Sequence, residues 1–239
     1  MNFLQLGSPV VMVGGLFRKP LLSEHEPCKP ILRGQFHHAA FYIHLLIGII
    51  VLSLAKDSLS QFAFFIYICC LLCLYGTSAT FHTTEWKDSK VEALVQKLDH
   101  CSIFLVISGT YTAVCMICLP FHEAWVKSLL VVVWITALTG IGKTVVWHDP
   151  PVIFNVGFYF FTGLVIMPFL PKVYQAIDGS QLLSCLIGGI AYLVGGCIYG
   201  LQSPDPLPEV FGYHEIFHVL TLVANACFMY PIIAKMIKD

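Results

Sequence analysis

The stretch SLSQFAFFIYICCLLCLYGTSATFHTT, residues 58–84, contains no Lys, Arg, Asp or Glu. A helix that crosses a bilayer needs roughly 20 predominantly apolar residues, with a range of about 17–25, so this stretch is long enough to span a membrane. It nevertheless carries a histidine, His82, close to its end. Ionisable residues inside a membrane are rare and mark functional sites. The stretch therefore predicts a transmembrane helix with a polar site at one end.

Six further runs lack the four charged residue types: residues 34–55, 101–122, 128–142, 150–171, 179–204 and 216–234. The run 128–142 is long enough to span if residues 124–127 join it. The chain has 57% hydrophobic and 11% charged residues and a mean hydropathy of +0.80, whereas soluble chains average about 45–50% apolar and about 25% charged. Only helices and closed barrels cross lipid, and the alternating pattern of a barrel strand is absent. We therefore predict an all-α, multi-pass integral membrane protein, a bundle of seven transmembrane helices.

The basic residues that flank the predicted spans indicate the orientation of the chain. On the side of the N-terminus lie Arg18, Lys19, Lys29, Arg33, Lys87, Lys90, Lys97 and Lys143. On the opposite side lie Lys56, Lys127, Lys172, Lys235 and Lys238. Because basic residues are enriched in cytoplasmic loops, we expect a cytoplasmic N-terminus and an exoplasmic C-terminus. We divide the chain into a short cytoplasmic segment, residues 1–33, and a seven-span domain, residues 34–239.

Four polar residues fall on one side of the membrane by the parity of the spans alone. His82 closes the second span, Asp99 opens the third in KLDHCSIF (97–104), and His214 and His218 open the seventh. Odd-numbered spans start, and even-numbered spans end, on the side of the N-terminus. Residues from three distant parts of the chain are therefore predicted to share one membrane face.

The string HEIFH (214–218) matches H-E-x-x-H, in which two histidines on one helix face bind zinc and the glutamate is the base. Four residues along a helix rise about 6 Å, so His214 and His218 can share an ion. The metalloprotease interpretation needs a third ligand downstream, where Cys227 is the one residue among His, Glu and Cys, more than two turns away. Since catalytic zinc typically has three protein ligands, we predict His82 as the third. Asp99 and Ser78, one turn before His82, would hydrogen-bond the water or the ligands.

Other motifs have simpler interpretations. We expect His37, His38, His44, His100 and His122 to be polar residues of the membrane interface, and His148 and Asp149 to belong to a turn before Pro150 and Pro151. The C-x-x-C pairs CLLC (70–73) and CMIC (115–118) are predicted to pack as small apolar residues. The small residues of GGIAYLVGG (188–196) indicate close packing of the sixth span, either against the seventh or at a dimer face.

Several motifs together resemble the haemolysin III and progestin/adipoQ receptor family. They are SATFH (78–82), KLDHCSIFLVISGTYT (97–112), GIGK (140–143) and YGLQSPDPLPEVFGYHEIFH (199–218). Their order and intervals agree over roughly residues 34–236, and the last stretch looks closer to the haemolysin III-like branch. The resemblance implies seven helices, a cytoplasmic N-terminus and a zinc ion held by His82, His214 and His218. It also implies that Asp99 contacts the water on the zinc, that Ser78 belongs to the site, and that the glutamate of HEIFH is not the essential base.

The resemblance leaves three functions open. The first is a zinc-dependent intramembrane hydrolase of a lipid amide or ester, similar to the alkaline ceramidases, with Asp99 and Ser78 as catalytic residues. The second is a receptor in which the zinc is structural, and the third is a pore-forming cytolysin. We expect membrane lipids as substrate or ligand and no nucleic acid as partner; a homo-oligomer remains open.

Overall fold

The structure is a computed structural model that describes residues 29–147 and 150–238. Its helices are α1 (Gln35–Leu54), α2 (Ser58–Thr83), α3 (Ser89–Ala113) with the π-helical turn η1 (Val114–Cys118), α4 (Ala124–Val146), α5 (Val152–Gly163), the 3-10 turn η2 (Met167–Phe169), α6 (Leu170–Ala176), α7 (Gly179–Leu201) and α8 (Tyr213–Lys238). In this part of the chain, seven helical segments are long and apolar enough to cross a membrane. The predicted bundle of seven transmembrane helices is therefore confirmed.

The fifth span, Val152–Ala176, consists of α5, η2 and α6 because two prolines interrupt it. Pro168 and Pro171 lack the N–H that a continuous helix requires, and each lies at the start of a new helical segment. The hydroxyl of Tyr111 donates a hydrogen bond to the carbonyl oxygen of Gly163, at 2.6 Å. A buried polar partner thus satisfies a backbone group at the break, as lipid surroundings demand.

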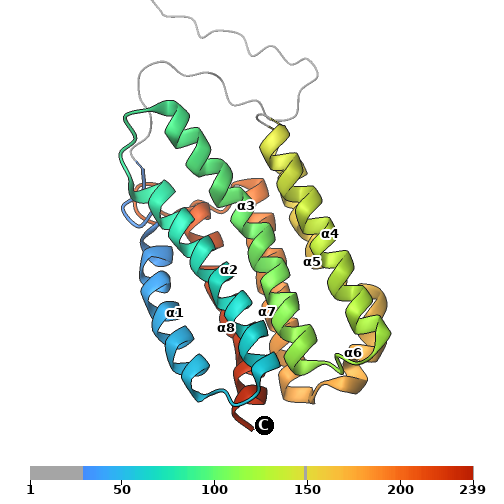
Figure 1. Ribbon diagram of the computed structural model, residues 1–239. Coiled ribbons are helices and arrows are strands. Elements are labelled where there is room, and N and C mark those ends of the chain that lie inside the picture. Colours follow the sequence, from blue (N-terminus) through green and yellow to red (C-terminus); the bar gives the residue numbers. More distant parts are fainter. Residues whose placement is uncertain (1–28, 148–149, 239) are drawn as a thin grey trace, which may run out of the picture.

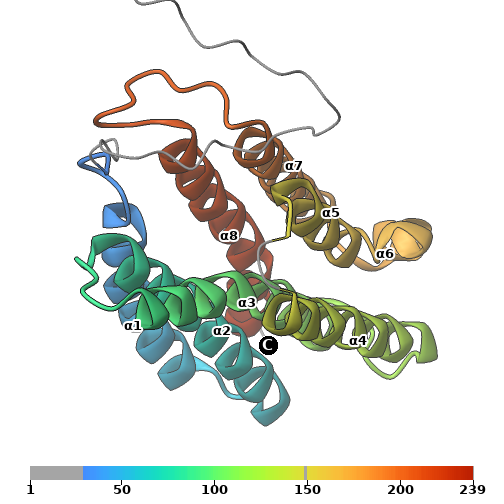
Figure 2. The ribbon, with the colours of Figure 1, turned by 90° about the horizontal axis from the view of Figure 1, so that it is seen from above.

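The spans form a closed ring (Figures 1 and 2). Helices α1, α2, α3 and α4 pack in chain order, and α5, α7 and α8 face them; contacts of α4 with α5 and of α1 with α8 close the ring. Helix α1 begins at the end opposite to that at which α8 finishes (Figure 1). Which of these ends faces the cytoplasm stays a prediction. The ring leaves an interior to which most of the spans can contribute side chains.

Helix α3 begins earlier than the charge-free run predicted. The Asp88 side chain accepts a hydrogen bond from the backbone N–H of Lys90 and caps the helix at Ser89. Asp99 therefore lies nearly three turns inside α3 rather than at its first turn, because a turn takes about 3.6 residues. The prediction that Asp99 opens the third helix was wrong, because a helix can continue beyond the apolar layer through charged residues such as those before Asp99.

The outer surface of the ring is apolar, as a lipid-facing surface should be. On α1 alone, Tyr42, Ile43, Leu46, Ile49 and Ile50 are exposed. The described cysteines, which include both C-x-x-C pairs, are free thiols.

The predicted close packing of the sixth span, α7, is also confirmed, and its partner is the seventh span, α8. A Cβ atom on Gly188 of α7 would lie 3.1 Å from the carbonyl oxygen of Ala224 in α8. A Cβ atom on Gly195 would lie 3.2 Å from the Cβ atom of Leu220. Small residues thus let α7 approach α8 closely.

Candidate metal centre

Three histidines from two helices meet inside one end of the bundle. Nitrogen atoms of His82, His214 and His218 all lie within 4.8 Å of one another, and the Nε2 atoms of His82 and His214 are 3.2 Å apart. Two nitrogens bound tetrahedrally at about 2.0–2.1 Å to one ion would be about 3.3–3.4 Å apart. The three predicted ligands therefore come together, and their donor atoms are spaced to hold a metal ion.

Two carboxylates accept hydrogen bonds from backbone N–H groups at the start of α8, the helix that carries His214 and His218. The carboxylate of Glu215 accepts a hydrogen bond from the backbone N–H of Gly212, at 2.8 Å, as in a capping box. The carboxylate of Asp205 accepts from the backbone N–H of Tyr213, at 3.0 Å. A Cβ atom on Gly212 would lie 2.1 Å from this Asp205 oxygen, so a side chain there would displace the Asp205 carboxylate from its hydrogen bond. The loop before α8 thus sets the direction of the helix that carries His214 and His218.

Glu215 is buried and paired with Arg33. Its side chain is 1% exposed, and its Oε1 atom accepts a hydrogen bond from Nε of Arg33. Its Oε2 atom is the one that accepts from Gly212. Both oxygens therefore stabilise the start of α8, and the triad of donor atoms does not include them. This arrangement differs from the protease motif, where the glutamate acts on the water.

The segment before α1 lies against both halves of the metal centre. Backbone N–H groups of Ile31 and Leu32 donate to the carbonyl oxygens of Glu209 and Val210 in the loop between α7 and α8. Gly34 then adopts a positive φ of 79°, a conformation that side chains disfavour. A Cβ atom there would lie 2.8 Å from the Cβ atom of His82. Glycine at this position therefore lets the chain pass directly beside a predicted ligand.

Asp99 and Ser78 lie next to the triad. An oxygen of the Asp99 carboxylate is 3.8 Å from Nε2 of His82, which is longer than the nitrogen spacing within a coordination shell. The Ser78 side chain is within hydrogen-bonding reach of this carboxylate, and both residues are buried. Asp99 is therefore placed to contact a small molecule bound beside the triad, whereas Ser78 can orient Asp99.

The triad opens into a cavity of about 570 Å³ inside the ring. Its wall includes residues from every span except the fourth, and it is mostly apolar. At one end it contains His82, Asp99 and His214, and it reaches Leu182 and Phe228 deep in the bundle. The cavity thus has ionisable side chains at one end and an apolar wall along the rest of its length.

A family model described as haemolysin-III related matches residues 26–229. The chain belongs to the haemolysin-III-related family. It is 29% identical over 189 residues to "Hemolysin-3" of Bacillus cereus, covering 79% of this chain and 82% of that protein. It is 26% identical over 176 residues to "Hemolysin-3 homolog" of Bacillus subtilis, covering 74% and 78%.

A second kind of relative is longer than this chain. The "Adiponectin receptor protein" of Drosophila melanogaster is 25% identical over 236 residues, a match that covers 87% of this chain and 52% of the fly protein. Haemolysin-III-related and adiponectin-receptor-like proteins are thus both similar to this chain, as the sequence motifs predicted.

In this haemolysin-III-related chain, several of the histidines that were expected at the membrane interface lie inside the bundle instead. His37, expected to be an interfacial polar residue, is 2% exposed inside the bundle, with its ring stacked on that of His218. His100, also expected at the interface, lines the same cavity as Asp99. His44 is half-buried, and its ring lies 4.8 Å from that of Tyr75. His38 is exposed and the His122 side chain is 83% exposed, in accord with an interfacial place. His148 and Asp149 lie outside the described residues.

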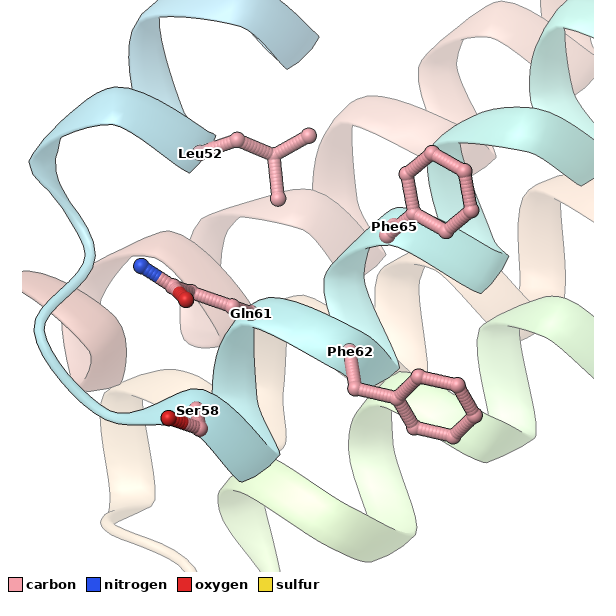
Figure 3. Close-up of a pocket in the computed structure, with 5 residues that line it drawn as sticks. All are labelled: Leu52, Ser58, Gln61, Phe62 and Phe65. Carbon is pink, nitrogen blue, oxygen red and sulfur yellow. The ribbon is translucent and has the colours of Figure 1, made fainter.

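A second depression of this haemolysin-III-related bundle lies far from the histidines, where α1 connects to α2 (Figure 3). It has a volume of about 380 Å³ and is lined by Leu52, Ser58, Gln61, Phe62 and Phe65. The amide of Gln61 donates a hydrogen bond to the carbonyl oxygen of Ala55. None of the lining residues is a metal-ligating or titratable type. The depression is therefore a weaker candidate than the metal centre.

Proposed function

We propose that this protein is a zinc-dependent hydrolase that cleaves a lipid amide or ester within the membrane. One observation supports the proposal above all. The three clustered histidines and the buried carboxylate of Asp99 open into an apolar cavity that the spans enclose. Such a cavity offers a lipid chain a place to lie while its polar linkage reaches the histidines.

The residues of the metal centre would have two roles, to bind the metal ion and to transfer a proton. His82, His214 and His218 would hold the ion as neutral imidazoles, and three protein ligands leave a position for water or substrate. When bound, zinc lowers the pKa of water from 15.7 to about 7 and polarises a carbonyl group. An Asp99 oxygen would accept the proton of the attacking water and deliver it to the leaving amine or alcohol. General acid–base steps of this kind contribute typically 10²–10⁴-fold to a rate.

The apolar part of the cavity would bind the acyl chain. Phe160, Leu193 and Phe228 are among the side chains that line it away from the histidines. Burial of apolar area contributes about 25 cal/mol per Å², so a long chain gains affinity without any polar contact. Ser78 would keep the Asp99 carboxylate directed at the reacting carbonyl.

The test is the release of fatty acid from ceramides and phospholipids by the purified protein in lipid vesicles. Asp99→Asn keeps the size of the side chain and removes the base, so release should fall by about 10²–10⁴-fold while zinc content is retained. Glu123→Gln makes the same change of charge at an exposed position of the opposite end and should not affect the rate. Equal rates for the wild type and Asp99→Asn would contradict the proposal.

A receptor with a structural metal is the second candidate, and the similarity to an adiponectin receptor protein favours it. In this case Asp99 would complete a closed coordination shell, and the cavity would hold a ligand that is not cleaved. Removal of zinc would then lower the melting temperature, while no substrate would release fatty acid. Release that depends on Asp99 would speak against this candidate.

Pore formation rests on the names of the Bacillus relatives alone. The charged residues that line the cavity are Lys29, Arg33, Glu92 and Asp99. All four are near the histidine end, so they do not line a path through the bundle as a channel requires. Erythrocyte lysis that polyethylene glycols block above a size threshold would support a pore. Lysis no greater than that caused by an unrelated membrane protein at equal dose would exclude it.

A further inference from the structure

His37 is a fourth histidine at the metal centre, and the triad does not need it. It lies in the first turn of α1 and is 2% exposed. Its ring stacks on that of His218 with centroids 3.8 Å apart and planes 7° apart. The set of donor atoms close enough to share an ion contains His82, His214 and His218 but not His37. Its position therefore calls for another role.

The hydrogen bonds of Thr221 determine which nitrogen of His37 carries the proton. The Thr221 hydroxyl donates its one proton to the carbonyl oxygen of His218, at 2.7 Å. The same hydroxyl oxygen lies 3.2 Å from Nε2 of His37. Because the hydroxyl has only one proton to donate, it accepts from His37, whose Nε2 must therefore bear the hydrogen. Nδ1 of His37 is left with a free lone pair.

This lone pair has no partner in the described part of the chain. Nδ1 of His37 is fully buried and makes no hydrogen bond with any residue in 29–147 or 150–238. Buried polar atoms are nearly always hydrogen-bonded, and each exception calls for an explanation. His37 also lines the cavity that contains Asp99 and His82. An unpaired acceptor on a residue that lines a binding cavity suits a donor group on the molecule that the cavity holds.

We propose that Nδ1 of His37 accepts a hydrogen bond from an N–H or O–H group of the bound lipid, next to the linkage that the metal centre faces. The inference rests on the proposed function in one respect, that the cavity holds a lipid. It adds a chemical requirement, because a simple ester has no donor near its carbonyl whereas a secondary amide or a hydroxylated lipid has one. His37 is then a specificity-determining residue rather than a ligand of the metal.

The experiment measures binding rather than turnover. Four probes share a palmitoyl chain: N-butyl palmitamide offers an N–H group, 2-hydroxyethyl palmitate offers a hydroxyl, and N-butyl-N-methyl palmitamide and butyl palmitate offer no donor. Each displaces a fluorescent fatty acid from the full-length protein in detergent. We expect wild type to bind at least one donor probe about 3- to 10-fold more tightly than its counterpart without a donor, since a neutral hydrogen bond is worth this factor. The pair that shows the preference identifies the donor as amide or hydroxyl.

Two variants test the residue itself. His37→Phe keeps a ring that can stack on His218 and removes the acceptor, so the preference should vanish while zinc content is unchanged. Thr221→Val leaves His37 in place but removes the acceptor that holds the proton on Nε2. The proton can then move to Nδ1, which no longer accepts, so the preference for a donor probe should shrink. His38→Phe makes the same substitution at the exposed neighbour and should leave the preference intact.

The outcomes separate this inference from the proposed function. Equal binding of all four probes by the wild type, or an unchanged preference in both His37→Phe and Thr221→Val, would overturn the role of His37 and leave the hydrolase intact. A preference that depends on His37 without any release of fatty acid would support the role of His37 and count against the hydrolase. If no probe displaced the fatty acid, the role of His37 would be overturned, and the release of fatty acid from ceramides and phospholipids would decide the hydrolase separately.

Discussion

The Nε2 atoms of His82 and His214 lie 3.2 Å apart although 132 residues separate them in the sequence. In neutral imidazoles, one ring nitrogen is an acceptor, and two acceptors that face one another repel unless a proton or an ion lies between them. With His218 close to both rings, an ion satisfies three lone pairs at once. The metal centre therefore joins α2 to α8.

Glu215 is predicted to matter for stability and not for chemistry. Arg33→Met would leave its buried carboxylate unpaired, which costs about 3–5 kcal/mol for a fully buried pair. Because the Arg33 side chain is 19% exposed, we expect the low end, about 3 kcal/mol. Adding Glu215→Gln to Arg33→Met should recover much of this loss. Thermal unfolding in detergent measures it.

The pairing of Glu215 with Arg33 distinguishes this site from that of an H-E-x-x-H protease, in which the glutamate is the base. Glu215→Gln alone should keep zinc and most of the hydrolytic rate, because Glu215 is held by Arg33 and Gly212. A loss of rate as large as that of Asp99→Asn, in folded protein with normal zinc content, would show that Glu215 is the base after all.

Gly34 is predicted to be required for the approach of the N-terminal segment to His82. Gly34→Ala places a Cβ atom 2.8 Å from that of His82 at a φ of 79°. The left-handed conformation alone costs about 1–2 kcal/mol, and the contact adds to it, so stability and zinc affinity should both fall. Gly142→Ala is the matched control, since nothing lies within 4 Å of a Cβ atom there. If both variants behaved alike, the close approach would not matter.

Ser78 is predicted to act through Asp99. Ser78→Ala should reduce fatty-acid release by about 10–100-fold, the usual effect of removing a group that orients a metal-site residue, with zinc retained. Ser102→Ala removes a hydroxyl that donates to the backbone carbonyl of Asp99, at 2.6 Å, rather than to its carboxylate. The control should therefore keep its rate. A larger loss in Ser102→Ala than in Ser78→Ala would contradict this role.

The orientation of the bundle is predicted to put the metal centre on the cytoplasmic side. A glycosylation acceptor sequence added after Asp239 should then be glycosylated in cells, and the same sequence before Met1 should not, because only the exoplasmic side receives the sugar. Glycosylation of the N-terminal sequence alone would show that the orientation is the opposite of the predicted one.

The spans could be predicted from the sequence because each shows as a run without charge. The parity of the spans put His82 on the same side of the membrane as His214 and His218, and the need of zinc for a third ligand joined it to them. The start of α3 was missed because Ser89 follows a capping Asp88, whereas a hydropathy run begins only where the charges end. The role of Gly34 was also out of reach, since its neighbour His82 is distant in the chain.

His37 and Arg33 show a second limit of sequence reasoning. A histidine near the start of an apolar run looks the same whether it faces headgroups or the bundle. Only the packing of α1 against α8 turns His37 toward His218. The ion pair of Arg33 with Glu215 joins positions 182 residues apart, and no spacing rule connects them.

The zinc content of the purified protein, measured by elemental mass spectrometry, shows directly whether the three histidines hold a metal ion. Wild type is compared with His82→Ala, with the double variant His214→Ala, His218→Ala, and with His122→Ala, whose side chain is 83% exposed. A three-histidine site predicts about one zinc per chain in wild type and His122→Ala, and a clear loss in the other two variants. Folded wild-type protein without metal, or full zinc content in His82→Ala, would contradict it.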